Sequence, residues 1–192
     1  MSQTFEHWDN RYKNNGNSGN GSYGLLAEFK AEIINNFIHE NNIHNIIELG
    51  CGDGNQCSLF KIDNYLGLDI SPSVIHYCNN KFQNNSKYNF KIYNNNYLNK
   101  ETYELSLSLD VIYHILHDNE YKKYMEDLFK FSNKYVIIYS NNHEGQKTGH
   151  MYSKNFTKDI EKWFNNYKLK NIIYQKYTNL SSADFYIYEK IK

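Results

Sequence analysis

The segment IIELGCGDGNQ places a glycine-rich turn directly after a run of apolar residues that starts with two isoleucines. Its glycines stand at alternate positions, Gly50, Gly52 and Gly54. Glycine allows backbone conformations that other residues avoid, and it lets a ligand approach the main chain closely. A turn of this kind between a strand and a helix is a binding loop for a small molecule.

The residues around this turn disfavour a phosphorylated ligand. The dinucleotide fingerprint G-x-G-x-x-G is not met, because Asn55 stands where the third glycine is needed, and the phosphate loop G-x-x-x-x-G-K-[ST] is absent. No Lys or Arg occurs from Ala31 to Phe60, whereas Glu48 and Asp53 bracket the turn. Two carboxylates would repel a pyrophosphate by about 1 kcal/mol per close pair even at water-like screening. We therefore expect a ligand that is cationic, or at least not polyanionic.

Two motifs resemble those of class I S-adenosylmethionine-dependent methyltransferases. ELGCGDGN resembles the first motif of that family, and YLGLDIS resembles its second-strand motif. S-adenosylmethionine suits an acidic turn, since it carries a sulfonium and an ammonium group and no phosphate. The resemblance implies that Gly50, Cys51 and Gly52 pass close to the methionine part of this cofactor. It also implies that Asp69 accepts hydrogen bonds from the ribose hydroxyls, and Glu48 is assigned to the same site.

The resemblance covers most of the chain. HWDNRY, SGNGSYGLLAEFKAE, LDVIYHILHD and KYVIIYS are similar to a group of small bacterial-type methyltransferases associated with surface-sugar or capsule pathways. It implies methyl transfer to a small polar acceptor, an oxygen of a sugar, nucleotide sugar or polysaccharide precursor, although a fold does not by itself fix the acceptor. The alternatives are a nucleotide-dependent oxidoreductase on a similar sheet and a non-catalytic subunit that binds the cofactor.

The adenine part of the cofactor lacks one expected partner. Many relatives carry an acid after the third strand that contacts the adenine amino group, but here residues 94–96 are all asparagine. The alternatives are that backbone groups hold the adenine or that apolar neighbours such as Ile70 and Tyr97 do, and Tyr97 is as well explained as a half-buried surface residue. Gly24 and Ser71 complete the set that we assign to the cofactor site.

The candidate catalytic residues follow the fourth and fifth predicted strands. Asp110 and His114 are four residues apart, and would share one face if that stretch were helical. His143 lies in the loop after the next strand. A general base is needed only when the acceptor is a hydroxyl with a high pKa. We expect these three residues to be catalytic, with Asp110 also contacting the cofactor; a structural role for each histidine is the alternative, and it is favoured for His117 and His150.

The N-terminal residues 1–24 are predicted to form a lid. Arg11 is the only arginine beside 20 lysines, which indicates a planar two-point contact with a carboxylate. The carboxylate of the cofactor is the first choice, an acidic acceptor the second and a surface ion pair the alternative. Trp8, Tyr12 and Tyr23 accompany it, and nearby glycines give the segment freedom to close.

Helical and strand-like patterns alternate along the chain and position these residues. The predicted helices start near residues 25, 55, 71, 118 and 157, and the predicted strands cover about 45–49, 65–69, 88–93, 103–109, 134–140, 169–175 and 184–190. Together with the resemblance, this order predicts an α/β fold. We expect a Rossmann-like sheet of seven mostly parallel strands, with helices on both faces and an antiparallel last strand, forming one domain over residues 1–192.

The composition limits partners and location. The 21 basic and 21 acidic side chains cancel, so that nucleic acid and membranes are not expected as partners, while a homo-oligomer is left open. The N-terminus lacks a basic and then apolar leader, which favours the cytoplasm. Three cysteines without CxxC spacing, and no HExxH motif, predict buried thiols, no disulfide framework and no metal.

Overall fold

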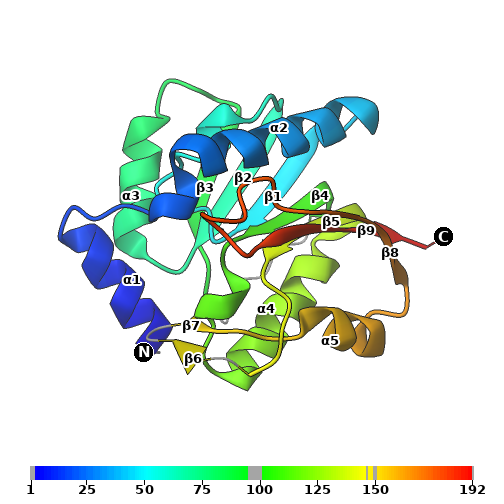
Figure 1. Cartoon of the computed structure of the whole chain (residues 1–192). Helices are drawn as coiled ribbons and strands as arrows, with labels where there is room; N and C mark the ends of the chain where they lie inside the picture. The colour runs from blue at the N-terminus through cyan, green and yellow to red at the C-terminus, as the bar shows by residue number, and fades with distance from the viewer. Residues whose placement is uncertain (1–2, 95–100, 146, 149–150, 192) are drawn as a thin grey trace. The chain divides into compact units, whose positions relative to one another are not determined.

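The computed structural model describes residues 3–94, 101–145, 147–148 and 151–191 (Figure 1). The chain divides into two compact units, Met1–Lys100 and Glu101–Lys192. Each unit contributes strands to a seven-stranded sheet with the order β3-β2-β1-β4-β5-β9-β8, and the elements of each unit are given separately below.

The first unit combines three parallel strands with three α-helices. Its elements are α1 (Gln3–Lys13), η1 (Asn20–Ser22), α2 (Gly24–Glu40), β1 (Asn45–Leu49), η2 (Cys57–Leu59), β2 (Asn64–Asp69), α3 (Pro72–Lys81) and β3 (Tyr88–Ile92). β2 pairs in parallel with β1 on one side and with β3 on the other. Parallel pairing brings the carboxyl ends of β1 and β2, Leu49 and Asp69, to the same edge of the sheet.

Local sequence explains where α3 begins. Ser71 caps the helix by accepting a hydrogen bond from the Val74 N–H, and Pro72 occupies the first turn, where its missing N–H costs nothing. The helix packs on β2 and β3, and α1 packs on α3. Thus the residues just after Asp69 are fixed by a helix start, as the sequence predicts.

The second unit carries the remaining strands of the sheet. Its elements are β4 (Tyr103–Leu109), η3 (Ile112–His114), α4 (Asp118–Lys130), β5 (Ser132–Ser140), the short β6 (Lys147–Thr148) and β7 (Met151–Tyr152), α5 (Phe156–Trp163), β8 (Tyr167–Ile173) and β9 (Asp184–Lys190). β4 and β5 are parallel, and β9 runs antiparallel to both β5 and β8. The predicted seven-stranded, mostly parallel sheet with an antiparallel last strand is confirmed.

Two local predictions are wrong. No helix starts at Asn55; only the 3-10 turn Cys57–Leu59 forms, in which the Ser58 hydroxyl also donates to the Asn55 carbonyl. Conversely, α1 (Gln3–Lys13) is a helix that the sequence pattern does not predict.

All three cysteines are buried free thiols, as predicted. Within the described parts of the chain, no helix has both the length and the apolar character that crossing a membrane requires.

Candidate functional site

The glycine turn after β1 has a backbone that only glycine adopts easily. Gly50, Gly52 and Gly54 all have positive φ, at 86°, 54° and 70°. The N–H groups of Gly50 and Cys51 both donate to the carbonyl of Leu68 in β2, at 2.7 and 3.0 Å. These bonds tie the start of the turn to the neighbouring strand.

The remaining N–H groups of the turn are also paired within the chain. Gly52 donates to the Asp69 carboxylate at 3.0 Å, and Asp53 donates to the Ser18 hydroxyl at 2.8 Å. Gly54 donates to the Cys51 carbonyl, and Asn55 donates to the Asp53 side chain. Phosphate-binding turns present such groups to the ligand. Because residues 50–55 all use theirs internally, this turn is a poor phosphate site.

Asp69 ends β2 beside the turn and keeps capacity to accept further hydrogen bonds. Its carboxylate accepts from the N–H groups of Gly52 at 3.0 Å and Ser71 at 2.9 Å, one on each oxygen. Two carboxylate oxygens offer about four acceptor positions. Burial raises the pKa of Asp69 to about 6, although these N–H bonds act in the opposite direction. The group is therefore ionised at neutral pH, as an acceptor for ribose hydroxyls must be.

Glu48 is not the ligand-facing acid that we expected. It is 2% exposed, and its carboxylate accepts a hydrogen bond from the Tyr65 hydroxyl at 2.5 Å. Burial raises the pKa of Glu48 to about 7, and the Tyr65 bond and the charge of Lys30 only partly oppose this shift. The acidic character of the turn therefore rests on Asp53 and Asp69 rather than on Glu48.

The segment between α1 and α2 is attached to the glycine turn through Asp53. The Ser18 N–H and the Tyr23 hydroxyl both donate to Asp53 Oδ2 at 2.8 Å, and Asn55 Nδ2 donates to the Ser22 carbonyl at 2.6 Å. Asp53 itself is buried. Ser18, Ser22 and Tyr23 thus contact the glycine turn directly, while a lid function of residues 1–24 stays a prediction.

Tyr12 and Ser18 lie directly against Gly52. A Cβ atom added to Gly52 would collide with the Ser18 hydroxyl and would lie 3.1 Å from the Tyr12 oxygen. The two hydroxyls are 3.1 Å apart and hydrogen-bonded. This glycine therefore serves a close approach of the N-terminal segment as well as a positive φ.

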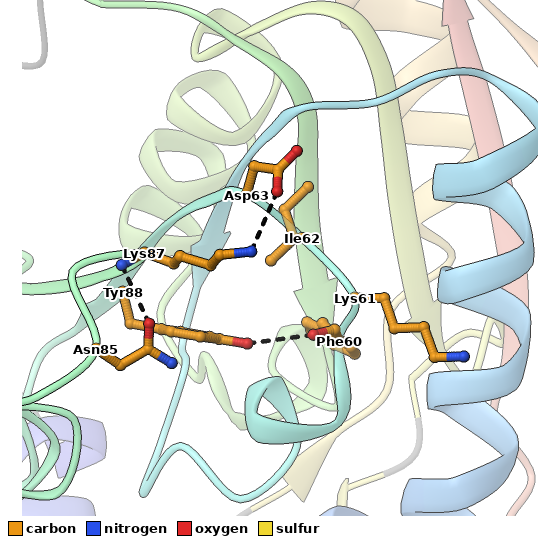
Figure 2. A pocket seen from close by; sticks show the side chains of 7 residues that line it. All are labelled: Phe60, Lys61, Ile62, Asp63, Asn85, Lys87 and Tyr88. Carbon is orange, nitrogen blue, oxygen red and sulfur yellow. Dashed lines mark hydrogen bonds and ion pairs between the residues drawn. The ribbon is translucent and has the colours of Figure 1, made fainter.

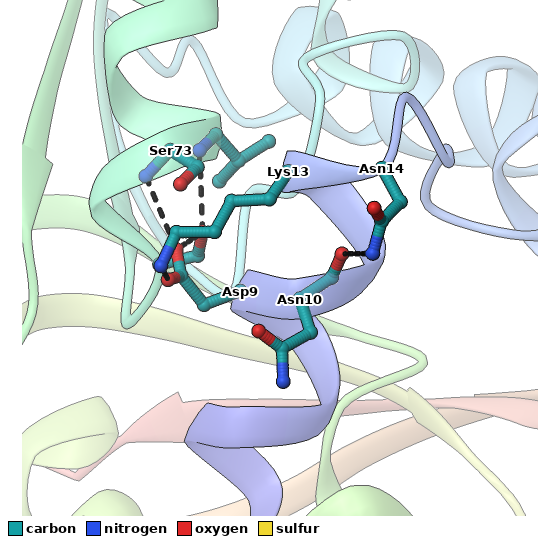
Figure 3. A network of polar contacts seen from close by, with 7 residues as sticks. Asp9, Asn10, Lys13, Asn14 and Ser73 are labelled. Carbon is teal, nitrogen blue, oxygen red and sulfur yellow. Dashed lines mark hydrogen bonds and ion pairs between the residues drawn. The ribbon is translucent and has the colours of Figure 1, made fainter.

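A second attachment joins α1 to the start of α3 (Figure 3). Asp9 is buried and accepts hydrogen bonds from the Ser71 hydroxyl at 2.7 Å and the Ser73 N–H at 3.3 Å, and it pairs with Lys13 at 2.7 Å. Burial alone would raise the pKa of Asp9, but the bonds from Lys13, Ser71 and Ser73 outweigh it and hold the pKa below its usual value. The Ser71 hydroxyl is used by Asp9 and by the helix cap, and the assignment of Ser71 to the cofactor site stays a prediction.

Arg11 is placed differently from our expectation. Its guanidinium donates to the carbonyl of Asn17 at 2.6 Å and to the Asn17 side chain at 3.3 Å, and it lies 5.8 Å from the centre of the Trp8 ring. The residue is exposed. Arg11 therefore stabilises the turn after α1, and a contact of its guanidinium with the cofactor stays a prediction.

The other residues assigned to the cofactor have simpler positions. Gly24 is the first residue of α2, with a φ of 54°, and Ile70 is partly exposed directly after Asp69. Asn95, Asn96 and Tyr97, considered for adenine, lie outside the described residues.

In the second unit, Asp110 and His114 do not share a helical face. Asp110 has a φ of 61°, and η3 (Ile112–His114) is a 3-10 turn, in which residues three apart align. Tyr113 therefore meets Asp110, and its hydroxyl donates to the carboxylate at 2.8 Å. The centres of the His114 and Tyr113 rings lie 4.6 Å apart. The two expected catalytic residues thus flank a tyrosine that the sequence analysis did not single out.

The remaining histidines are less informative. His143 is exposed in the loop after β5, His117 caps α4, and His150 lies outside the described residues. Within the described ranges, no group of three or more His, Cys, Asp or Glu side chains is arranged to hold a metal ion.

A family model described as a methyltransferase domain matches residues 40–189. The chain belongs to this methyltransferase domain family. The matched range contains the glycine turn, Asp69, Asp110, His114 and His143. No curated protein matches the sequence.

Solved structures with the same fold include several methyltransferases. The N-methyltransferase NodS from Bradyrhizobium japonicum WM9, in complex with S-adenosyl-L-homocysteine, has a TM-score of 0.76 at 9% identity, and all of both chains is covered. The magnesium protoporphyrin IX methyltransferase from Synechocystis PCC 6803 with bound S-adenosylhomocysteine has a TM-score of 0.69 at 15% identity, over 98% of this chain and 95% of that one. An S-adenosylmethionine-dependent methyltransferase from Clostridium acetobutylicum ATCC 824 has a TM-score of 0.66 at 15% identity, with 98% of each chain covered.

S-adenosylmethionine is the cofactor of the methyltransferase domain, as predicted, and the turn fits such a group. Asp69 offers an ionised carboxylate beside a turn whose N–H groups are already satisfied. Such a turn suits a ligand that needs hydroxyl acceptors and a close backbone rather than phosphate donors.

The contacts of Tyr12, Ser18 and Asp9 escaped the sequence analysis. They join residues 35 to 62 positions apart, and no local pattern reports such a distance. The one available signal was the spacing of Asp9 and Lys13, an i,i+4 pair of opposite charge that favours a helix.

A pocket of about 480 Å³ lies at the opposite end of β2 and β3 (Figure 2). Its lining residues precede β2 or begin β3, so it lies away from the glycine turn; they are Phe60, Lys61, Ile62, Asp63, Asn85, Lys87 and Tyr88. The Lys87 ammonium pairs with Asp63 at 3.2 Å, and the Tyr88 hydroxyl donates to the Phe60 carbonyl at 3.2 Å. These contacts brace the amino ends of the strands.

Proposed function

We propose that this methyltransferase transfers the methyl group of S-adenosylmethionine to a small polar acceptor. The acceptor atom that we propose is an oxygen of a sugar, a nucleotide sugar or a capsule precursor. We further propose that the two units act together as one methyltransferase domain within the cytoplasm.

The observation that carries the cofactor site is the pairing of the glycine turn with Asp69. All N–H groups of residues 50–55 are satisfied internally, so a dinucleotide would find no phosphate donors there. The ionised Asp69 carboxylate retains acceptor capacity for the ribose hydroxyls. This arrangement favours a methyltransferase over the alternative of a nucleotide-dependent oxidoreductase.

The protein's contribution to methyl transfer is orientation. The cofactor, when bound, supplies an activated methyl group with a good leaving group. The chain holds the acceptor in line with that group and removes a proton if the acceptor is a hydroxyl. We assign the base role to His114, which follows β4 in the turn η3, and we keep His143 as the second candidate. Asp110 is a positioning residue in this assignment, because its carboxylate is held by Tyr113.

The sugar acceptor rests on the resemblance of four sequence segments and on the absence of net charge. With 21 basic and 21 acidic side chains, the chain has no excess of cations for an RNA backbone. The solved relatives are described by other acceptors, among them magnesium protoporphyrin IX and small RNA, and they share the fold at 9 to 19% identity. The acceptor class therefore needs a direct assay.

The test supplies methyl-labelled S-adenosylmethionine together with separate pools of nucleotide sugars, sugar phosphates, amino sugars, porphyrins and small RNAs. We expect label in a nucleotide sugar or sugar pool, on an oxygen that mass spectrometry locates. His114→Gln should lower the turnover by about 100-fold, the size of a lost general base, whereas His117→Gln, a matched change at the cap of α4, should retain it. Label on a nitrogen, a porphyrin or RNA would overturn the acceptor that we propose.

A non-catalytic role would give a different result in the same assay. The protein would bind S-adenosylhomocysteine in calorimetry, yet no pool would acquire label above the level of a boiled sample. Failure to bind S-adenosylhomocysteine at all would overturn the cofactor site itself.

A further inference from the structure

The carboxylate of S-adenosylmethionine needs donors that the glycine turn does not supply. The N–H groups of residues 50–55 all donate to acceptors within the chain. A carboxylate pressed against them would lose its water and gain no hydrogen bond, which is costly. If the proposed function holds, the donors must therefore come from outside residues 50–55.

The nearby cations of the N-terminal region are engaged elsewhere. Arg11 donates to Asn17, and Lys13 pairs with Asp9. Lys81 lies near the turn, where its ammonium donates to the Asp53 carbonyl at 3.2 Å. Lys81 is thus a competing donor that the experiment must include.

Tyr12 has the required position. Its hydroxyl would lie 3.1 Å from a Cβ atom on Gly52, at the point where the turn carries no side chain of its own. Burial, and then the charge of Asp69, raises the pKa of Tyr12. The phenol therefore keeps its proton at all physiological pH values and can act as a donor.

Ser18 can orient that proton. The Ser18 oxygen accepts from the Asp53 N–H at 2.8 Å and is 3.1 Å from the Tyr12 oxygen. If Ser18 donates its own hydroxyl hydrogen to Tyr12, then the Tyr12 hydrogen is directed to a further acceptor. We propose that the Tyr12 hydroxyl, oriented by Ser18, donates a hydrogen bond to the carboxylate of the methionine part of S-adenosylmethionine.

The carboxylate is a better partner for this donor than the ribose. Asp69 already supplies acceptors for the ribose hydroxyls, which donate and so need no further donor. A carboxylate only accepts, and a hydrogen bond to it from a partly buried phenol is of the stronger, charge-assisted kind. Tyr12 thus takes the role that the sequence suggested for Arg11.

The experiment compares two ligands by titration calorimetry: S-adenosylhomocysteine, and 5′-methylthioadenosine, which has the same nucleoside and sulfur but no amino-acid part. Five variants are tested beside the wild type, and the fifth, Ser18→Ala, supplements the four that follow. Tyr12→Phe removes the donor, and Tyr88→Phe is the matched control, since its hydroxyl bonds to the Cys57 and Phe60 carbonyls at the other end of the strands. Lys81→Met removes the competing donor, and Asp69→Asn changes the ribose site.

We expect Tyr12→Phe to weaken the binding of S-adenosylhomocysteine by about 10- to 100-fold, which is the range for the loss of a hydrogen bond to a charged group. Its affinity for 5′-methylthioadenosine should stay within about twofold of the wild type. Asp69→Asn should lower the affinity for both ligands by the same factor, while Tyr88→Phe and Lys81→Met should leave both affinities unchanged. Ser18→Ala removes the hydroxyl that orients Tyr12. It should lower the affinity for S-adenosylhomocysteine alone, by a smaller factor than Tyr12→Phe does.

Two results would overturn the assignment of Tyr12. One is that Tyr12→Phe leaves the affinity for S-adenosylhomocysteine unchanged. The other is that Tyr12→Phe lowers the affinity for both ligands equally, which would mean that Tyr12 contacts the nucleoside. A selective loss in Lys81→Met would transfer the role to that lysine. If the wild type binds neither ligand, the proposed function fails, and this outcome is distinct from the other three.

Discussion

Ser18 and Asp53 hydrogen-bond to each other in both directions, although 35 residues separate them. The Ser18 N–H donates to the Asp53 carboxylate at 2.8 Å, and the Asp53 N–H donates to the Ser18 hydroxyl at 2.8 Å. The bond from the Asp53 N–H satisfies a donor of the glycine turn. The bond from the Ser18 N–H holds the segment that follows α1. The N-terminal region is therefore hydrogen-bonded to the glycine turn from both partners.

Ser18→Ala should loosen this attachment without unfolding the protein. The substitution leaves the Asp53 N–H without its acceptor, which costs about 1–3 kcal/mol. We expect faster hydrogen exchange in Gln3–Lys13 and a lower unfolding midpoint. Ser58→Ala is the control, because the Ser58 hydroxyl donates only to the nearby Asn55 carbonyl at an exposed position. Equal exchange rates in both variants would contradict the structural role of the Ser18 pair.

Gly52→Ala should weaken cofactor binding for two separable reasons. A positive φ of 54° costs an alanine about 1–2 kcal/mol, and the new Cβ would also meet the Ser18 hydroxyl and the Tyr12 oxygen. Gly145→Ala is the control for a positive φ without a collision, since Gly145 has a φ of 72° and no neighbour within 4 Å of an added Cβ. We expect Gly52→Ala to bind S-adenosylhomocysteine at least about tenfold more weakly than Gly145→Ala, which is about 1.4 kcal/mol. Matching affinities would show that the contact with the N-terminal segment is dispensable.

The main architecture was predictable because its signals are local. Alternating strand and helix patterns predict all seven strands of the sheet, and Ser71 with Pro72 marks the start of α3. The glycine turn and Asp69 were identified for the same reason, since each lies where a strand ends. Periodicity and turn chemistry need only a few neighbouring residues.

The details of the candidate site were not predictable, because they depend on contacts distant in sequence. α1 forms against the start of α3 through Asp9 and Ser71, 62 residues apart. The position of Glu48 in the sequence predicts a ligand-binding acid, but its buried carboxylate accepts a hydrogen bond from the Tyr65 hydroxyl. A 3-10 turn in place of an α-helix pairs Asp110 with Tyr113 instead of His114. In the first two cases a side-chain partner distant in sequence decides the outcome, and in the third a local change of helix type does.

Cofactor binding should depend on pH through Asp69. Burial raises the pKa of this carboxyl from 3.8 to about 6, so that it accepts a proton as the pH falls below 6 and loses acceptor capacity. The affinity for S-adenosylhomocysteine should be constant near pH 7 and then fall toward pH 5, by up to about tenfold per pH unit if only the ionised form binds. Calorimetry at pH 5, 6 and 7 measures this profile.

Asp69→Asn is the control for this pH profile. The amide does not titrate, so its weaker binding should be nearly flat over the same range. Glu48 and Asp53 are the other acids near Asp69, and both remain in the variant. A variant profile as steep as that of the wild type would assign the pH dependence to one of them.

Glu48 should make the folded protein less stable as the pH rises toward neutrality. The pKa of this buried carboxyl is raised from 4.5 to about 7, first by burial, so the folded state retains a proton that the unfolded state has released. The free energy of unfolding therefore falls between about pH 4.5 and pH 7 and levels off above that range, by roughly 3 kcal/mol for a shift of this size. Asp69 adds a change of the same sign between pH 3.8 and about 6.

Glu48→Gln should remove most of this dependence. The glutamine keeps an acceptor for the Tyr65 hydroxyl but has no proton to lose, so the variant should gain stability relative to the wild type as the pH rises from 5 to 8. Urea unfolding at several pH values measures the difference. Glu126→Gln, at an exposed position of α4, is the matched control and should follow the wild-type curve. Parallel curves for Glu48→Gln and the wild type would mean that Glu48 is ionised throughout, held so by Tyr65 and Lys30 against the cost of burial.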